Sequence, residues 1–370
     1  MKIEHFCGKY FSSYLLIICV LLSSFYLFSC DENPESAETG IQYSWQSADP
    51  STLGLDQEKL NAALTEAGNK SFINSVLVIR HGKIAAERYY NGFDQNKPQN
   101  VRSVSKSFLS AMIGIAVSDS LLSIDQKVMD FYPEYKNYVQ DPRINNITIK
   151  ELLNMKGGFD TDENIYNYVT NSSNWIRTTL SLQLLSDPGT EFHYSTPAVH
   201  LLSGILTKAS GMSTREFAEE YLLEPMGISV GEWQQDPQGI YFGGNNMFFT
   251  TRNMAVLGLM YMNGGKLDGK QIVPSDWVAK SISPLWSLPG SSWGELTNYG
   301  YGYFWWTGTL KNYKVFFALG HGGQYVMCFP SLDMIVTATS DSYIDFAPAD
   351  EQERSVLSII ADYILPAVKD

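Results

Sequence analysis

The chain has 370 residues, of which 44% are hydrophobic and 13% aromatic, enough apolar material for one large domain or two ordinary ones. This composition excludes a disordered or fibrous protein. The formal net charge is −13, from 39 acidic and 26 basic residues. No run of Lys and Arg offsets that charge, so the chain should repel a phosphate backbone, which argues against nucleic-acid binding.

The N-terminus has the layout of an export signal. Lys2 and Lys9 precede an apolar run from Tyr14 to Phe28. The run ends in Leu27-Phe28-Ser29-Cys30, which resembles the cleavage site of a bacterial lipoprotein. We therefore expect residues 1–29 to be a signal peptide and Cys30 to carry the lipid of an exported, membrane-anchored protein of the cell envelope. An uncleaved anchor and an ordinary signal peptide are the alternatives.

The segment after the cysteine is polar and acidic. Residues 30–52 therefore read as a tether that holds the domain off the bilayer. We find no internal repeat and no second linker, so residues 53–370 should form one folded unit.

The first expected elements are a helix, a hairpin and a second helix. Asp56 can cap a helix with one apolar face that ends at Gly68. The β-rich runs Ser75–Ile79 and Ile84–Tyr90 flank a glycine turn, which predicts a hairpin. Val104–Val117 is apolar almost all round, as is typical of a helix buried at the centre of a domain.

Helix signals dominate the middle of the chain, and strand signals return after Gly265. The expected helices are Pro197–Ala209, one that starts at a capping box at Ser213–Glu216, Arg252–Met262 and a last one near Asp350–Leu365. The expected strands are Tyr301–Thr309, Lys314–Leu319, Gln324–Phe329 and Met334–Thr339. This order predicts an α/β (α+β) fold with a central sheet formed from both chain ends, flanked by helices, and an all-helical lobe inserted at about residues 118–263.

Ser103-Val104-Ser105-Lys106 carries the first chemical signal. A serine hydroxyl needs a base within hydrogen-bond reach, and residues three apart share a helix face, so the amine of Lys106 can lie beside Ser103. The start of a buried helix disfavours an ammonium and aims free N–H groups at an oxyanion. Alone, the pattern arises by chance about once or twice in such a chain, and the alternative is a capping serine with a solvated lysine.

Two further segments could complete such a site. Thr196 is expected to cap the helix that includes Pro197, which puts Tyr194 at a helix mouth, where its phenol could exchange protons with the amine. In Leu319–Gly323, three glycines allow a strand to approach a ligand, and the N–H of Gln324 could form the second half of an oxyanion hole. A core tyrosine and an ordinary hairpin turn are the alternatives.

Together and in this order, the three segments resemble the motifs of the serine β-lactamase and penicillin-binding protein superfamily. The chain looks most like the class C β-lactamase-related branch, which includes esterases, D-aminopeptidases, carboxypeptidases and nylon-oligomer hydrolases. The similarity runs from about Leu53 to Pro366 and includes local stretches such as Ile147–Met155. The resemblance implies a β-lactamase/transpeptidase-like fold and a reaction that needs no cofactor.

The resemblance also implies roles for particular residues. Ser103 would be the acylated nucleophile, Lys106 and Tyr194 the proton-transfer pair, and His321-Gly322-Gly323 the strand edge that faces the substrate. Thr196 stands where penicillin-recognising members have Asn, and His321-Gly322 replaces their Lys-Thr pair. Since a neutral imidazole binds a carboxylate less well than an ammonium does, we expect poor turnover of β-lactams.

The sequence therefore predicts a serine hydrolase that cleaves a small ester, amide or D-amino-acid peptide through a serine acyl-enzyme. A D-alanyl-D-alanine carboxypeptidase or β-lactamase is the alternative within the enzyme class. A lipoprotein that is acylated without turnover and acts as a sensor is the alternative outside it.

The remaining polar and aromatic residues are less informative. His81 is expected in a solvated turn, His200 as a packing residue, and His193 as a neighbour that could support Tyr194. Several tryptophans could rim the site, with core packing as the alternative for the last two: Trp175, Trp286, Trp293, Trp305 and Trp306. The acids near Asp160 belong to an expected loop and receive no role. No spacing of His, Cys or carboxylates indicates a metal site, so none is expected.

Overall fold

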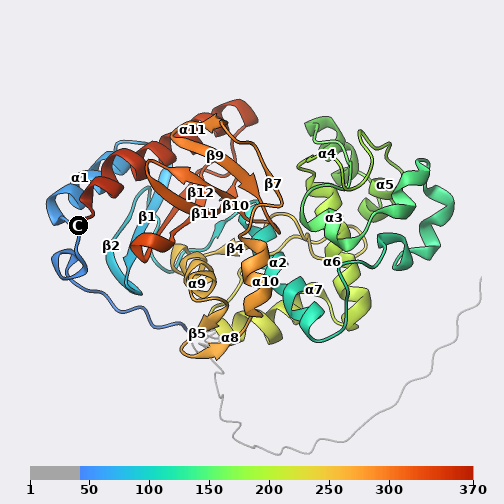
Figure 1. The fold of residues 1–370 in the computed structure, drawn as a ribbon, viewed down its shortest axis with the longest axis horizontal. Helices are drawn as coiled ribbons and strands as arrows, with labels where there is room; N and C mark the ends of the chain where they lie inside the picture. The colour runs from blue at the N-terminus through green and yellow to red at the C-terminus, as the bar shows by residue number, and fades with distance from the viewer. Residues whose placement is uncertain (1–41, 370) are drawn as a thin grey trace, which may run out of the picture. The chain divides into compact units, whose positions relative to one another are not determined.

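The computed structural model describes residues 42–369, and the predicted signal peptide and Cys30 lie outside them (Figure 1). The described chain contains a nine-stranded antiparallel sheet in the order β2-β1-β13-β12-β11-β10-β9-β7, with β8 also paired to β9. Its strands are β1 (Ile73–Arg80), β2 (Lys83–Tyr89), β7 (Trp286–Ser287), β8 (Ser292–Trp293), β9 (Leu296–Tyr301), β10 (Trp306–Leu310), β11 (Tyr313–Gly320), β12 (Gln324–Phe329) and β13 (Met334–Ser340). The prediction of one sheet built from both chain ends is confirmed.

The pairing of β1 with β13 joins the two ends of the chain. Along β1, successive side chains enter opposite faces of the sheet, as the strand period requires. Leu77 and Ile79 join the core on one face, while Val76 and Val78 join the core on the other. Both faces are therefore buried, which explains why these strands read as nearly continuous apolar runs.

Helices cover both faces of the sheet. On one face lie α1 (Gln57–Gly68) and α11 (Phe346–Ile359), which pack against each other. On the other face, α2 (Val104–Ser118) contacts β11 and β12, and α9 (Thr251–Met262) contacts β1, β12 and β13. As predicted, Asp56 caps α1 by accepting from the N–H groups of Glu58 and Lys59.

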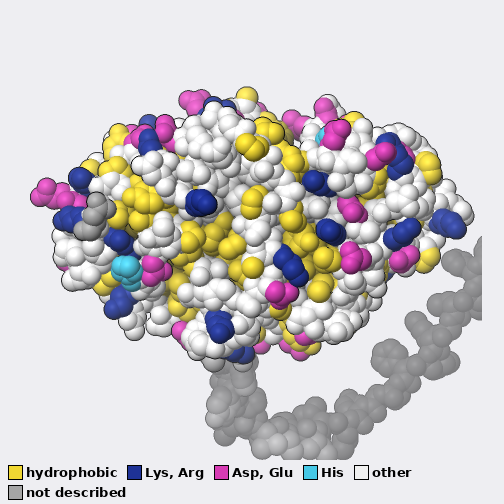
Figure 2. Space-filling model, in the orientation of Figure 1, with side chains coloured by type: hydrophobic (Ala, Val, Ile, Leu, Met, Phe, Trp, Pro, Cys, Tyr) yellow, Lys and Arg dark blue, Asp and Glu magenta, His cyan; other side chains and the backbone are white. Residues whose placement is uncertain are grey.

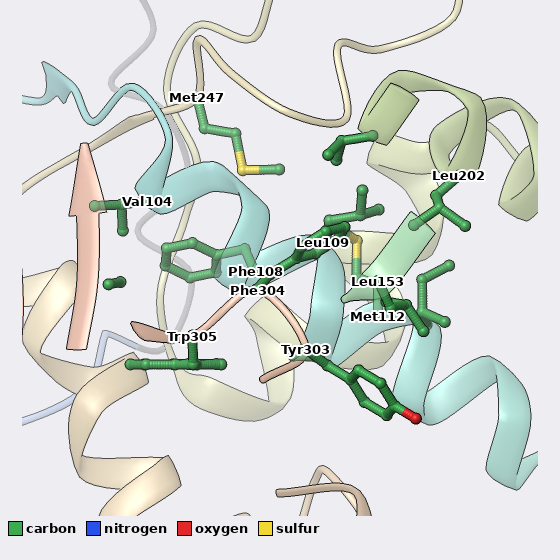
Figure 3. Packing of buried hydrophobic residues seen from close by; sticks show 14 of the residues in the cluster. Val104, Phe108, Leu109, Met112, Leu153, Leu202, Met247, Tyr303, Phe304 and Trp305 are labelled. Carbon is green, nitrogen blue, oxygen red and sulfur yellow. The ribbon is translucent and has the colours of Figure 1, made fainter. Parts of the chain in front are cut away.

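Helix α2 is the centre of the larger core. Every residue from Val104 to Ala116 is buried. Figure 3 shows Val104, Phe108, Leu109 and Met112 of this helix among side chains from the lobe, such as Leu153 and Leu202, and from the segment between β9 and β10, such as Phe304 and Trp305. The all-round apolar pattern thus reflects contacts on every side of the helix.

The helical lobe contains α3 (Ile149–Leu153), α4 (Glu163–Thr170), α5 (Trp175–Leu180), α6 (Thr196–Ser210), α7 (Thr214–Ala218) and α8 (Glu224–Met226). Helix α6 packs against α2, α3 and α5, so it links the lobe to the central helix. The capping box predicted at Ser213 and Glu216 is present. After α9, α10 (Ser275–Ser281) also packs against α2.

Three boundaries differ from the predicted ones. Helix α9 packs on the sheet, so the lobe ends before Thr251 rather than near residue 263. The run expected as one strand over Tyr301–Thr309 is divided into β9 and β10 by a turn in which Phe304 has a φ of 61°. The last helix starts at Phe346, before the expected residue 350.

The described end of the predicted tether is attached to the domain. The N–H of Tyr43 donates to the carbonyl of Gly227, the indole of Trp45 donates to the carbonyl of Arg252, and Ser47 bridges to Ile84. The folded unit therefore begins before residue 53.

No helix among residues 42–369 is both long enough and apolar enough to cross a membrane. Figure 2 shows acidic and basic side chains scattered over the face in view, without one large basic patch.

The central helix gives a test of core packing. Gly114 lies on α2, where an added Cβ would be 2.5 Å from ring atoms of Trp277. In a free helix Gly→Ala stabilises by about 1 kcal/mol, but overpacking a core costs about 1–3 kcal/mol. We therefore expect Gly114→Ala to lower the free energy of unfolding measured with denaturant, while Ser118→Ala, at the exposed end of the same helix, changes it little. A stabilised Gly114→Ala variant would contradict this packing.

Candidate active site

Ser103 stands at the cap position immediately before α2. The preceding residue, Arg102, has a φ of 50°, so the chain turns sharply into the helix. The N–H groups of Val104, Ser105 and Lys106 donate to carbonyls three residues earlier. The N–H of Ser103 has no partner within the described chain. The sequence predicted several free N–H groups at the start of this helix. In the structure the three that follow the serine are bonded, and the N–H of Ser103 remains available as a donor.

Lys106 lies fully buried behind the serine. Its Nζ donates to Ser103 Oγ at 2.7 Å, to the carbonyl of Gly244 at 2.7 Å and to Thr196 Oγ1 at 3.1 Å. No carboxylate is among these partners. Desolvation lowers the pKa of Lys106 well below the usual 10.5, because burial penalises the ammonium. The sequence-predicted pairing of Ser103 with a buried amine is therefore present in the structure.

Tyr194 comes from the loop before α6 and meets the same pair. Its ring centroid lies 4.9 Å from Lys106 Nζ, and its ring stacks on Trp306 with centroids 5.9 Å apart. Burial raises the pKa of Tyr194, an interaction with the Ser103 side chain lowers it, and the negative charge of Glu353 raises it further. The structure thus brings Ser103, Lys106 and Tyr194 together from two helix beginnings.

The cap of α6 differs from the prediction. Ser195 occupies the cap position and Thr196 is the first helical residue, with Pro197 second. Thr196 Oγ1 is therefore free to accept from Lys106 instead of holding a backbone N–H. The carbonyl of Gly244 was not expected here. The sequence feature that could have indicated this carbonyl is the Gly243-Gly244 pair. A Cβ on Gly244 would lie 3.0 Å from the Thr196 side chain, so glycine allows the backbone to approach closely here.

A cleft of about 500 Å³ opens in front of the serine. Ser103, Tyr194 and Thr196 line it together with the aromatic rings of Tyr166, Trp306 and Phe346. Six carboxylate residues also line it: Asp160, Asp162, Glu163, Asp345, Asp350 and Glu353. The basic residues among the described lining are Arg102 and His321. Asp162 and Glu163 cap and begin α4 rather than lying in a loop.

The end of β11 lies against the backbone that precedes the nucleophile. A Cβ on Gly320 would be 2.3 Å from the carbonyl oxygen of Val101 and 3.1 Å from Arg102 Cβ, so only glycine fits there. The next residue, His321, lines the cleft, and its Nε2 donates to the carbonyl of Ile344 at 2.6 Å. The N–H of His321, like that of Ser103, has no partner within the described chain.

The rest of the predicted glycine segment lies away from the cleft. Gly322 and Gly323 form the turn beside Asp341, Ser340 and α11 and are not among the cleft-lining residues. Gln324 is fully buried in β12, where its amide donates to the carbonyl of Ser340 and accepts from the N–H of the same residue. The structure therefore brings Leu319 and His321 of this segment to the lining, but not Gly322, Gly323 or Gln324.

Glu353 of α11 is a cleft residue that the sequence did not reveal. Its Oε1 accepts from the N–H of Gly322 at 3.0 Å. Burial and the negative charge of Asp350 raise the pKa of Glu353 to about 7, although the Gly322 bond acts in the opposite direction. Nothing in the local sequence marks this glutamate, because its position depends on α11 crossing beside the β11–β12 turn.

The other candidate residues have structural places. His81 is exposed in its turn and pairs with Asp333 at 3.0 Å, and His200 is buried and bonded to Asp236 at 3.0 Å, as expected for a turn and a packing residue. His193 lies 3.4 Å from Glu191 and does not line the cleft. Trp305 is a core residue, whereas Trp306 lines the cleft. In residues 42–369 no group of three or more His, Cys, Asp or Glu could hold a metal ion.

Comparisons with known proteins identify the family and the fold. The chain is 24% identical over 277 residues to a 6-aminohexanoate-dimer hydrolase of Paenarthrobacter ureafaciens, a match that covers 68% of each chain. It is 33% identical over 180 residues to a probable fimbrial assembly protein FimD, serogroup H1, of Dichelobacter nodosus, a match that covers 44% of this chain and 45% of that relative. The chain therefore matches less than half of the fimbrial protein's length.

Among solved structures, a putative 6-aminohexanoate-dimer hydrolase from Bacillus anthracis superposes with a TM-score of 0.68 at 20% identity, over 86% of this chain and 88% of the other. The fold is that of the serine hydrolases related to β-lactamases. A sequence model of the family described as Beta-lactamase matches residues 74–359, so the chain belongs to this family.

The buried lysine gives a pH prediction. Only a neutral amine can accept the proton of Ser103, so the rate at which a fluorophosphonate probe labels the serine should rise with pH through a pKa well below 10.5. Lys106→Arg should remove this rise together with the labelling, since a guanidinium stays protonated.

Glu353, whose pKa is raised to about 7, can also titrate during this experiment and needs a control. The rise should persist in Glu353→Gln. A labelling rate in the native protein that rises only near the ordinary lysine pKa of about 10.4 would refute a neutral Lys106 as the base.

Proposed function

We propose that this protein hydrolyses an ester or amide by acyl transfer to Ser103. The observation that carries the proposal is the buried amine of Lys106, which lies 2.7 Å from Ser103 Oγ without a carboxylate partner. A neutral amine there takes the hydroxyl proton as Oγ attacks the carbonyl carbon, and the resulting ammonium keeps three acceptors: Ser103 Oγ, Thr196 Oγ1 and the carbonyl of Gly244.

The two unpartnered N–H groups suit an oxyanion hole. These N–H groups belong to Ser103 and His321. Their two segments lie close together, because Gly320 lets the end of β11 approach Val101 and Arg102. Preorganised backbone donors stabilise the charge that develops on the carbonyl oxygen without reorganising during the reaction. We assign the second donor to His321 in place of the expected Gln324, because His321 lines the cleft and Gln324 does not.

Tyr194 is placed to carry the proton onward. Its hydroxyl interacts with Ser103, and its ring lies over the Lys106 amine. A phenol in this position can pass a proton to the leaving group and then help a water molecule attack the acyl-enzyme. Stacking on Trp306 holds the ring in place, and the phenol interacts with the Ser103 side chain.

Labelling tests the nucleophile. A fluorophosphonate probe should modify the native protein, and Ser103→Ala should abolish the modification, as seen by intact-protein mass spectrometry. Ser118→Ala on the same helix is the matched control and should label normally. Equal labelling of the native protein and Ser103→Ala would rule out the proposed nucleophile.

Measurements of turnover distinguish the proposed function from the alternative functions. Steady release of p-nitrophenol from a simple ester, without turnover of a chromogenic cephalosporin, would favour an esterase or amidase. Efficient turnover of the cephalosporin would favour a β-lactamase. Acylation in a one-to-one ratio without release would favour a sensor.

Removing the phenol hydroxyl tests the role of Tyr194. Tyr194→Phe keeps the ring that stacks on Trp306 but loses the proton carrier. We expect deacylation to slow by about 10²–10⁴-fold, the usual contribution of a general acid or base, so that an acyl-enzyme accumulates and becomes visible by mass spectrometry. Unchanged steady-state turnover in this variant would remove Tyr194 from the mechanism.

A further inference from the structure

The cleft in front of Ser103 has an unusual balance of charge for a site that binds carbonyl compounds. Its lining holds six carboxylate residues and two basic ones. The guanidinium of Arg102 is already engaged, since its Nε and Nη2 donate to the carbonyl of Ser342 and its plane lies over Tyr343. His321 is similarly tied to the carbonyl of Ile344. These bonds to neutral carbonyls do not remove the charge of Arg102, but six carboxylates outnumber two basic residues, so the lining is predominantly acidic.

Glu353 stands out among these carboxylates. Asp350 pairs with Arg354 and accepts from the indole of Trp293, and Asp162 caps α4. Four of the other lining carboxylates likewise make no ion pair with a cation of residues 42–369, but Glu353 is half-buried, and one of its two oxygens accepts from the N–H of Gly322. A half-buried carboxylate with an oxygen left over gains free energy when a cation binds beside it.

Glu353 is also close to the reacting groups. Its charge raises the pKa of the Tyr194 phenol, and both side chains line the same cleft. The rings of Trp306 and Phe346 share that lining. Carboxylates combined with aromatic faces are the surroundings that proteins use to hold ammonium groups.

We propose that this cleft selects ester or amide substrates that carry an ammonium group, and that Glu353 is the residue that selects them. The inference rests on the proposed function, since it names the substrate class of the same site. It also predicts that a substrate bearing a carboxylate in that position is rejected, because it would meet Glu353 and its acidic neighbours.

Several charged or titratable groups surround Glu353, and the pH dependence must account for them. Asp350 raises its pKa from the same helix, Tyr194 faces it across the cleft, and Tyr325 of β12 donates to its backbone carbonyl. The pKa of Tyr194 is raised above its ordinary value of 10 by burial, and that of Tyr325 also lies well above 10, so both phenols stay neutral near pH 7. With a pKa of about 7, Glu353 is ionised above that pH and protonated below it. Preference for an ammonium substrate should therefore rise as the pH rises through about 7.

The experiment uses three p-nitrophenyl esters whose acyl chains have equal length and end in a primary ammonium, a methyl group or a carboxylate. A primary ammonium has an ordinary pKa of about 10.4 and stays charged through this range. We expect kcat/KM for the ammonium ester to exceed that for the methyl ester by about tenfold at pH 8, a difference of about 1.4 kcal/mol, and the carboxylate ester to be the poorest substrate.

Glu353→Gln should bring the ratio of ammonium to methyl ester close to one and make it independent of pH, while Glu353→Asp should restore part of the preference. Glu351→Gln, on the exposed side of the same helix, is the matched control and should keep the native ratio. Fluorophosphonate labelling of Ser103 in each variant reports that the site is folded and reactive.

The outcomes separate the two proposals. If the native protein is labelled at Ser103 but shows no preference for the ammonium ester, or if Glu353→Gln is labelled and keeps the native preference, the inference about Glu353 is wrong and the proposed function stands. If Ser103 is not labelled in the native protein, the proposed function fails first.

Discussion

The structure depends on keeping one lysine amine uncharged. An ammonium needs water or an anion, and Lys106 has neither, because it is fully buried and its recorded partners are two hydroxyls and a carbonyl. Removing water from Lys106 requires protein on every side of the first turns of α2, and both the sheet and the lobe supply it. The all-round apolar helix thus keeps this amine away from water and is also the centre of the core.

The same constraint explains how the neighbouring segments are built. The lysine must not meet a carboxylate, so its acceptors are uncharged oxygens brought from distant parts of the chain. Thr196 supplies one because Ser195 takes the capping position of α6, and Gly244 supplies another because a glycine lets the backbone approach. Gly320 brings the end of β11 against Val101 for the same steric reason. Close backbone approach at two glycines assembles the candidate site around the nucleophile.

Local signals were enough to predict much of this fold from the sequence. Helix α1 begins after Asp56 and ends at Gly68, as predicted, because caps act within one turn. Strand β12 has the predicted limits because its apolar run ends at clear turns. The lobe boundary and the division between β9 and β10 were mispredicted. Whether α9 packs on the sheet or in the lobe, and whether Gly302 and Phe304 continue a strand, depends on tertiary contacts that short windows do not contain.

The candidate site divides in the same way. Ser103 and Lys106 are three residues apart on one helix, so helical geometry alone places their side chains together, as the sequence predicted. The sequence assigned the second oxyanion donor to Gln324, and that assignment depended on where the glycine turn lies relative to the end of its strand. In the structure β11 ends at Gly320, so the residue that follows the strand is His321. Glu353 had no local signal at all, because its place in the cleft depends on α11 crossing beside that turn.

This division has a consequence for how such a site can change its substrates. Ser103, Lys106 and Tyr194 stand at the beginnings of α2 and α6, whereas the carboxylates of the cleft come from α4, from α11 and from the residues just before these helices. A substitution at His321 or Glu353 changes the charge that the substrate meets without moving the amine beside the serine. Under the proposed function, the reacting groups and the charged lining rest on different elements, so the same acyl-transfer groups could serve substrates of opposite charge.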